Sequence, residues 1–522
     1  MSNETSMGIR SVARPFIAAA ALAALAACTI NPVTGERELA LVSAEDEVAI
    51  GAAQYFPSRQ SQGGDYVVDP ALGSYVSSVG QRVAAQSERA LPYEFVVLNN
   101  SVPNAWALPG GKIAINRGLL LELGSEAELA AVLGHEVVHA AARHGAQAMQ
   151  RGMLLQGALL ATTFGAQRGN YSNLVVGAAS VGAQLINQRY SRGAELESDL
   201  HGTRYLAAAG YDPRAAVSLQ ETFVRLSQGR GNDGWLAGLF ASHPPSTERV
   251  EQNRRTAAGL PAGGELGRER YQAAIARLAA ARPAYDAYDA GRAALAEERF
   301  EDARRHADEA LRLLPAEAHF HALHGDIDYE QRRFDSAVAH YREAIARNDL
   351  FFYYPLRKGF AHQQLRQWGD AEAELEKSVA ILPTADAYYG LGAIAEQRGD
   401  RAGALERYAL AAESSSPAGQ AARDAAIRLD LPQNPGNYLT VSSGLDSQGQ
   451  LLIEVANPTG VAAADVVVAI RYAAADGSLR QTTRTLSRVD PGAGQRIATG
   501  LGPFTSQNAY EVAVASARVD GS

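Results

Sequence analysis

The chain of 522 residues has little of three features that mark other protein classes. It has one cysteine, Cys28, so no intramolecular disulfide can form, and the 47% of apolar residues must build its cores. It has no basic excess: the formal net charge of −9 argues against nucleic acid as a partner, because phosphate binding requires a basic surface. Its first apolar run, residues 16–27, is too short to span a bilayer.

That short run explains the lone cysteine. Two basic residues, Arg10 and Arg14, precede it, and it ends in Leu25-Ala26-Ala27-Cys28, which resembles a bacterial lipobox. Residues 1–28 are therefore predicted to be a lipoprotein signal peptide, with Cys28 lipidated. The alternative is a cleaved signal followed by an unmodified cysteine. Because Thr29 is not aspartate, we expect a periplasmic protein anchored through Cys28 to the outer membrane.

One motif carries metal chemistry. His135-Glu136-Val137-Val138-His139 has the H-E-x-x-H pattern and follows a helix start signal, the capping box of residues 125–128. Residues four apart lie on one helix face, so both imidazoles can reach one metal ion. Glu136 lies beside them and can accept a proton from the attacking water without being a ligand.

A catalytic site of this type needs a third ligand, and the best candidate is Glu195. Asp199 lies four residues later on the same predicted helix face, where it can hydrogen-bond a ligand imidazole. Glu197 is the competing ligand. Its alternative roles are a solvated side chain or a pair with His201, and His144 is interpreted as structural because it lies off the ligand face.

Four sequence blocks together resemble one enzyme family, the HtpX/CAAX-prenyl-protease-type gluzincin metallopeptidases, and most closely their periplasmic lipoprotein branch (BepA/LoiP-like). The blocks are residues 104–111, 135–144, 191–199 and 242–249. The resemblance implies that Zn²⁺ is bound by His135, His139 and Glu195, with Glu136 as general base. It also implies that His243 and Arg249 stabilise the oxyanion, or that His243 covers the zinc in a latent state.

The same resemblance assigns a substrate-binding edge strand to Asn104 and Ala105. Such a strand holds the backbone of an extended, unfolded peptide by β-augmentation. Trp106 fits the protein core as well as it fits the cleft.

An internal repeat occupies about residues 284–418. Glycines recur there at steps of 34, 34 and 33 residues, and alanines follow the same steps: Gly291, Gly325, Gly359, Gly392, and Ala303, Ala337, Ala371, Ala404. This period resembles four tetratricopeptide repeats, in which small residues let paired helices approach closely. The repeats are predicted to bind a protein partner.

The expected fold class is multidomain. Residues 29–283 form an α+β, mainly α, gluzincin metallopeptidase domain, residues 284–418 an all-α solenoid, and residues 437–522 an all-β sandwich of immunoglobulin-like type. The last assignment rests on four strand-like segments: residues 451–455, 466–472, 482–486 and 510–514.

These features predict a zinc endopeptidase acting on unfolded or misassembled envelope proteins. The alternatives are an assembly scaffold with a largely latent protease and a processing peptidase for one substrate. Two further segments bear on function. The mostly uncharged stretch from Met153 to Asn187 is expected to form a buried helical hairpin, or else to touch the membrane. The glycine-rich stretch from Gly229 to Gly234 is a candidate lid.

Overall fold

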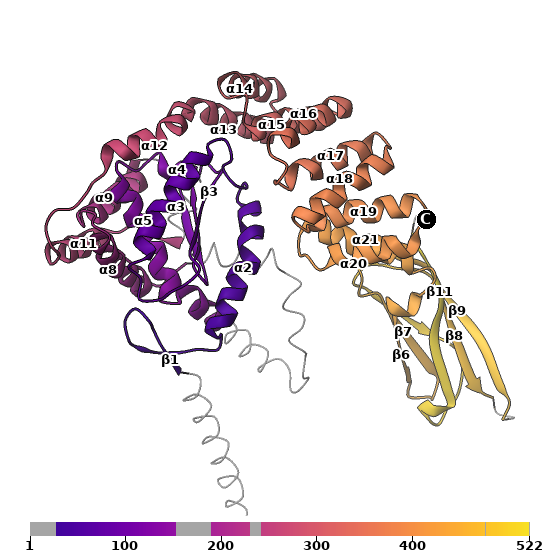
Figure 1. The fold of residues 1–522 in the computed structure, drawn as a ribbon. Coiled ribbons are helices and arrows are strands. Elements are labelled where there is room, and N and C mark those ends of the chain that lie inside the picture. The colour runs from indigo at the N-terminus through magenta and orange to yellow at the C-terminus, as the bar shows by residue number, and fades with distance from the viewer. Residues whose placement is uncertain (1–27, 153–188, 230–241, 475–476, 521–522) are drawn as a thin grey trace, which may run out of the picture. The chain divides into compact units, whose positions relative to one another are not determined.

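The computed structural model describes residues 28–152, 189–229, 242–474 and 477–520, and the chain divides into two compact units at Tyr354/Pro355 (Figure 1). The signal peptide before Cys28, the segment from Met153 to Asn187 and nearly all of the candidate lid lie outside the described residues. Among the described helices, none combines the length and apolar character needed to cross a membrane.

A three-stranded sheet lies at the centre of the first unit. Its strands are β3 (Glu94–Leu98), β4 (Ala105–Leu108) and β5 (Lys112–Asn116), in the order β3-β5-β4. β3 pairs with β5 in parallel, and β4 pairs with β5 antiparallel. In the turn between β4 and β5, Gly110 and Gly111 both adopt positive φ angles that favour glycine. Because β4 is the last strand in the order β3-β5-β4, it forms one edge of the sheet.

Helices cover both faces of this sheet, as Figure 1 shows. Alternate strand residues face opposite sides: Ile113 and Ile115 of β5 join the main core, whereas Ala114 faces a smaller cluster with Tyr55 and Trp106. Trp106 is thus a core residue. The covering helices are α2 (Ala44–Ser61) on the smaller cluster's side and α3 (Pro70–Ala84) and α5 (Glu126–Ala141) on the other.

Serine caps start the helices that matter for the site. Ser125 accepts a hydrogen bond from the backbone N–H of Glu128 and begins α5. The second hydrogen bond of the predicted capping box is displaced by one residue, because the Glu128 carboxylate accepts the backbone N–H of Gly124 instead of that of Ser125.

The other elements of this region are β1 (Cys28–Ile30), β2 (Arg37–Leu39), α4 (Arg117–Leu120), α8 (Arg192–Ala208), α9 (Ala215–Gly229), α11 (Thr247–Ala258) and α12 (Arg268–Ala280).

Antiparallel helix pairs follow at the predicted period and form a tetratricopeptide-like region. Its helices are α13 (Arg282–Ala296), α14 (Phe300–Leu313), α15 (Ala318–Glu330), α16 (Phe334–Arg347), α17 (Tyr353–Gln364), α18 (Trp368–Ile381), α19 (Ala385–Gln397), α20 (Arg401–Ala412) and α21 (Pro417–Asp430). The small residues act as expected. A Cβ on Gly325 would lie 2.7 Å from the Tyr341 ring, and one on Gly392 would lie 2.6 Å from the Tyr408 ring.

The turn inside each helix pair uses a left-handed residue at the same period. The φ angles are 57° at Glu298, 60° at Arg332, 58° at Arg366 and 75° at Gly399. Only the last of these positions has the glycine that this conformation favours.

The C-terminal region holds two three-stranded antiparallel sheets over one apolar core. The sheet orders are β10-β7-β6 and β11-β8-β9. The strands are β6 (Thr440–Leu445), β7 (Leu451–Ala456), β8 (Ala463–Ala473), β9 (Leu479–Val489), β10 (Gly494–Ala498) and β11 (Tyr510–Val519). All four predicted strand segments are present, β6 and β10 were not predicted, and the immunoglobulin-like assignment stays a prediction, as do the predicted domain boundaries.

Candidate metal centre

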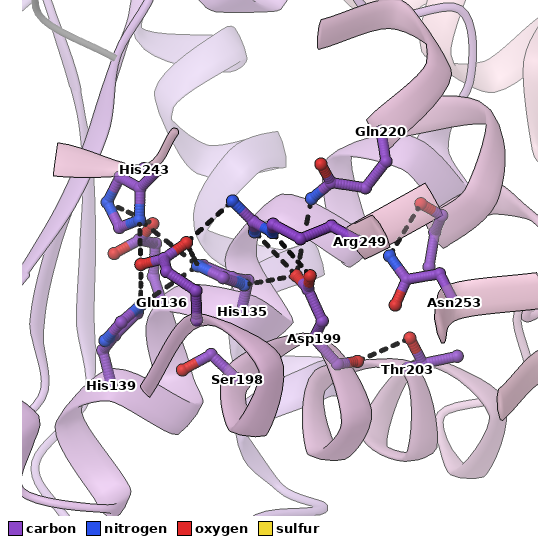
Figure 2. Close-up of polar contacts among 12 residues, drawn as sticks. His135, Glu136, His139, Ser198, Asp199, Thr203, Gln220, His243, Arg249 and Asn253 are labelled. Carbon is purple, nitrogen blue, oxygen red and sulfur yellow. Dashed lines mark hydrogen bonds and ion pairs between the residues drawn. The ribbon is translucent and has the colours of Figure 1, made fainter. Parts of the chain in front are cut away.

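Three elements bring the candidate ligands together. α5 carries His135 and His139 on one face, α8 carries Glu195, and His243 lies just before α11. One ligand atom from each of these four residues lies within 4.8 Å of all the others. Figure 2 shows the three histidines close together, with Glu136 beside them. The spacing of four residues in the H-E-x-x-H motif thus places both imidazoles at one point, as helix periodicity requires.

Two glycines let α5 and α8 approach closely. A Cβ on Gly202 of α8 would lie 3.0 Å from the backbone nitrogen of His135, and one on Gly134 would lie 3.2 Å from the carbonyl oxygen of Gly202. The helix that carries the histidines therefore contacts the helix that carries Glu195 backbone to backbone. This close contact sets the distance between the two helix backbones, and so the distance that the side chains of His135, His139 and Glu195 must span to meet.

The ligand atoms have the spacing that zinc requires. Nε2 of His135 lies 3.0 Å from Nε2 of His139 and 3.3 Å from Nδ1 of His243. Oε1 of Glu195 lies 3.3 Å from Nε2 of His139, and Oε2 of Glu195 lies 3.5 Å from Nε2 of His135. Ligand atoms around one tetrahedral Zn²⁺, at bond lengths of about 2.1 Å, lie about 3.4 Å apart. The set of imidazole and carboxylate donors also suits zinc.

Asp199 and Arg249 contact the candidate ligands through hydrogen bonds and ion pairs. Oδ1 of Asp199 lies 3.0 Å from Nδ1 of His135, as expected for a carboxylate that orients a ligand imidazole. Arg249 donates through Nε and Nη2 to both oxygens of Asp199, at 2.7 and 2.8 Å, and its Nη1 lies 2.8 Å from Oε2 of Glu195. Arg249 therefore contacts two buried carboxylates, and it also lines the cavity that contains Glu136 and His243.

These charges perturb the pKa values of the cluster. Burial alone would lower the pKa of His135, but the carboxylates of Glu195 and Asp199 outweigh burial and raise it to about 10. Burial alone would raise the pKa of Glu195, but His243, His135 and Arg249 hold it well below its ordinary value. The two shifts thus have one physical cause, the close packing of buried carboxylates, imidazoles and a guanidinium.

Glu136 differs from the other carboxylates. It is 2% exposed, and its Oε2 has no hydrogen-bond partner among the described residues. Burial raises its pKa. It lines a small cavity together with His243 and Ala105, the first residue of the edge strand β4. A buried carboxylate with a free oxygen beside the ligand cluster has the position and the basicity of a general base.

His243 lies inside the ligand cluster. Its Nδ1 is 2.9 Å from Oε1 of Glu195, and its Nε2 is 3.6 Å from Oε1 of Glu136. Nε2 is buried and has no hydrogen-bond partner among the described residues. In this arrangement His243 can supply a fourth ligand, its imidazole nitrogen, to the metal.

Three residues at the site have contacts that were not predicted from the sequence. His144 was interpreted as structural, but its Nδ1 lies 3.0 Å from Nδ1 of His139. Glu197 was expected to be solvated or to pair with His201, but its direct partners are Asn31 and His144. Tyr190 was not singled out, and its ring stacks on His139 with centroids 3.9 Å apart. The contacts of Glu197 and Tyr190 join separate segments, so sequence spacing gave no signal for them. His144 lies beyond the end of α5, where Arg143 has a φ angle of 65°, so helix spacing does not describe its contact with His139.

The predicted substrate strand has the expected place in the sheet. Ala105 belongs to the edge strand β4 and is 1% exposed, and Asn104 precedes it and is 5% exposed. Ala105 lines the cavity that also contains Glu136. The backbone of β4 therefore passes next to the candidate base.

Comparisons with known proteins agree with this site. Residues 70–257, which include all four candidate ligands and Arg249, match the model of peptidase family M48. Metalloprotease YcaL of Escherichia coli K12 is 32% identical over 198 residues, which cover 36% of this chain and 74% of that protein. Beta-barrel assembly-enhancing protease of Yersinia pestis is 27% identical over 242 residues, 45% of this chain and 48% of that protein.

Other matches cover less. Mitochondrial metalloendopeptidase OMA1 of Arabidopsis thaliana is 35% identical over 162 residues, 30% of each chain. The chain thus spans about half or less of the length of several relatives that it matches. The Arabidopsis OM64 TPR domain aligns with 22% of this chain at 19% identity and a TM-score of 0.22, so the repeat assignment rests on the helix pairs described above.

Proposed function

The chain belongs to peptidase family M48, and from that premise we propose that it is a zinc-dependent endopeptidase acting on unfolded or misassembled envelope proteins. One observation carries the proposal. His135, His139 and Glu195 converge at zinc spacing directly beside the free carboxylate oxygen of Glu136.

In the proposed reaction, a zinc ion held by His135, His139 and Glu195 would supply Lewis acidity for the scissile carbonyl and the attacking water. Glu136 accepts the proton of that water at Oε2 and later returns it to the leaving amine, and its raised pKa suits both steps. Asp199 accepts the Nδ1–H of His135, which leaves the Nε2 lone pair for the metal. We assign Arg249 to positioning Asp199 and Glu195, in place of the predicted contact with the oxyanion.

The substrate is proposed to enter as an extended strand. β4 is a sheet edge beside the cavity, so Asn104 and Ala105 would pair with peptide backbone, which only an unfolded segment offers. The repeats would recruit a protein substrate or partner. A lipid on Cys28 would hold the enzyme at a membrane, for which we propose the periplasmic side of the outer membrane.

A second function is an assembly scaffold with a largely latent protease. The position of His243 favours it, because a fourth protein ligand closes the coordination site that catalytic zinc keeps open for water and substrate. In this state His243 must leave the metal before peptide hydrolysis can begin.

The test is metal content together with casein cleavage, on the mature chain lacking Cys28 and on its Glu136→Gln variant. About one zinc per chain, with cleavage reduced at least 10²-fold in the variant, is the expected result. Zinc without cleavage in either protein would favour the scaffold. Folded, metal-replete chain that holds no zinc would overturn the endopeptidase proposal.

A further inference from the structure

A series of polar side-chain contacts begins at the candidate ligand His139, in addition to the contacts of His135 with Asp199 and Arg249 described above. Its Nε2 faces the ligand cluster, and its Nδ1 lies 3.0 Å from Nδ1 of His144. Nε2 of His144 lies 3.5 Å from Oε1 of Glu197, and Nδ2 of Asn31 donates to the same oxygen at 3.1 Å. The order of contacts is His139, His144, Glu197, Asn31.

The hydrogens of this series of contacts can be assigned in one consistent way. When Nε2 of His139 binds a metal, its Nδ1 carries the hydrogen and donates it to Nδ1 of His144. The hydrogen of His144 then belongs on Nε2, which faces the acceptor Glu197. The hydroxyl of Ser198, 3.5 Å from Nδ1 of His144, is a weaker donor to the same lone pair.

Asn31 is fixed firmly enough to hold the far end. It is 1% exposed, and its Nδ2 also donates to Oε1 of Glu38 at 2.8 Å. Its Oδ1 accepts the backbone N–H groups of Val33 and Thr34 at 2.9 and 3.3 Å, which closes the turn between β1 and β2. Asn31 lies three residues after Cys28.

We infer that Glu197, acting through His144, is a positioning residue for His139, and that Asn31 holds Glu197 in place. Glu197 and His144 thus serve His139 as Asp199 serves His135, and the N-terminal hairpin completes the surroundings of the metal. The inference rests on the proposed function, because it takes His139 to be a zinc ligand. Outer groups that orient ligand imidazoles typically change metal affinity by about 10–100-fold.

The experiment measures zinc affinity by competition with a chromophoric chelator, and the visible spectrum of the Co²⁺-substituted mature chain. Glu197→Ala is expected to weaken zinc binding about 10-fold or more and to shift the Co²⁺ spectrum. Glu197→Gln keeps an acceptor for His144 and is expected to restore most of the affinity. Asn31→Ala is expected to lose about 3–10-fold, because Glu197 and both imidazoles remain.

Glu38→Ala is the matched control, since it removes the other acceptor of Asn31 and leaves the series of contacts to His139 intact. Its affinity should equal that of the wild type. Unchanged zinc affinity in Glu197→Ala, or an equal loss in Glu38→Ala, overturns the inference. If Glu197→Ala does not fold, wild-type affinity in Asn31→Ala overturns it. A wild-type chain without zinc affinity overturns the proposed function as well, so the two failures are distinguishable.

Discussion

Nη1 of Arg249 lies 2.8 Å from Oε2 of Glu195, while the opposite edge of the same guanidinium binds Asp199. One buried cation is thus shared between a candidate zinc ligand and the carboxylate that orients another. Because all three side chains are at most 5% exposed, water cannot replace the guanidinium if it is lost.

Replacing Arg249 with methionine is expected to destabilise the zinc-free chain by about 3–5 kcal/mol, since two buried carboxylates lose their counter-ion. Urea unfolding monitored by circular dichroism measures this. Arg254→Met is the control on the same helix, because Arg254 and its partner Glu221 are about half exposed and should cost about 1 kcal/mol or less. Equal losses in the two variants would contradict the shared-cation role.

Replacing His243 with alanine separates its two possible roles. We expect weaker zinc binding and faster casein cleavage, because the variant removes a closing ligand from the metal. Chelator competition and a cleavage assay measure the two effects on the same preparation. Unchanged zinc affinity with kcat lowered about 10²–10³-fold would instead identify His243 as an oxyanion donor.

The contact between α5 and α8 predicts that Gly202 tolerates no side chain. Gly202→Val should destabilise the chain by about 1–3 kcal/mol and weaken zinc binding, because its Cβ meets the backbone of His135 at 3.0 Å. Gly193→Ala is the control in the same helix, since its Cβ would meet only Ser191 Oγ, at 3.9 Å. That control should be neutral or slightly stabilising. Comparable thermal shifts in both variants would argue against a close helix contact.

Glu126, the first residue of α5, gives a pH-dependent prediction. Burial alone would raise the pKa of this carboxyl, but hydrogen bonds from Arg270, Tyr75 and Tyr211 outweigh burial and hold it below the ordinary value. A carboxyl with a depressed folded-state pKa stabilises the fold above its unfolded-state pKa of about 4.3, and this contribution is lost as the pH falls through the folded-state value.

The stability difference between wild type and Glu126→Gln should therefore be constant near neutral pH and shrink below about pH 4.5. Urea unfolding at a series of pH values tests this. A difference that stays the same down to pH 3 would show that the hydrogen bonds do not favour the ionised form.

The left-handed turns of the repeats predict one stabilising change. Arg332 is exposed and has φ 60°, so Arg332→Gly should relieve about 1 kcal/mol of backbone strain, less the entropy cost of glycine. Gly399→Ala, at the equivalent position of a later repeat, should destabilise by a similar amount. Thermal unfolding of both variants measures the shifts, and changes of the same sign would contradict the prediction.

Helix periodicity explains how much of the site was predictable. The four-residue steps from His135 to His139 and from Glu195 to Asp199 fix which side chains share a helix face, so these residues followed from spacing as candidates for the site. The partners of Arg249 and Glu197 did not, because they depend on how α8, α11 and the N-terminal hairpin pack. No spacing within one segment encodes contacts such as Asn31 to Glu197, which are 166 residues apart.

In the fold, too, the features that depend on local spacing were predicted, and those that depend on tertiary pairing were not. The small-residue steps of Gly325 and Gly392 predicted the helix pairs, because each removes a side chain at a point of contact. Strand β6 was missed because Thr440 to Leu445 reads TVSSGL, which lacks the apolar alternation that marked β7. Its pairing with β7 along six residues specifies it as a strand, and that pairing is a tertiary property.

The convergence of His135, Glu195 and His243 also bears on folding. His135 and His243 are 108 residues apart in the chain, and Glu195 lies between them on another helix. The unfolded chain holds no such cluster, so metal binding adds its free energy to that of folding, by about 2.7 kcal/mol at a free zinc concentration 100 times the dissociation constant. The ion would therefore hold three distant segments together whether or not the protein cleaves peptides. A chelator would shorten the lifetime of the folded domain and also remove its activity.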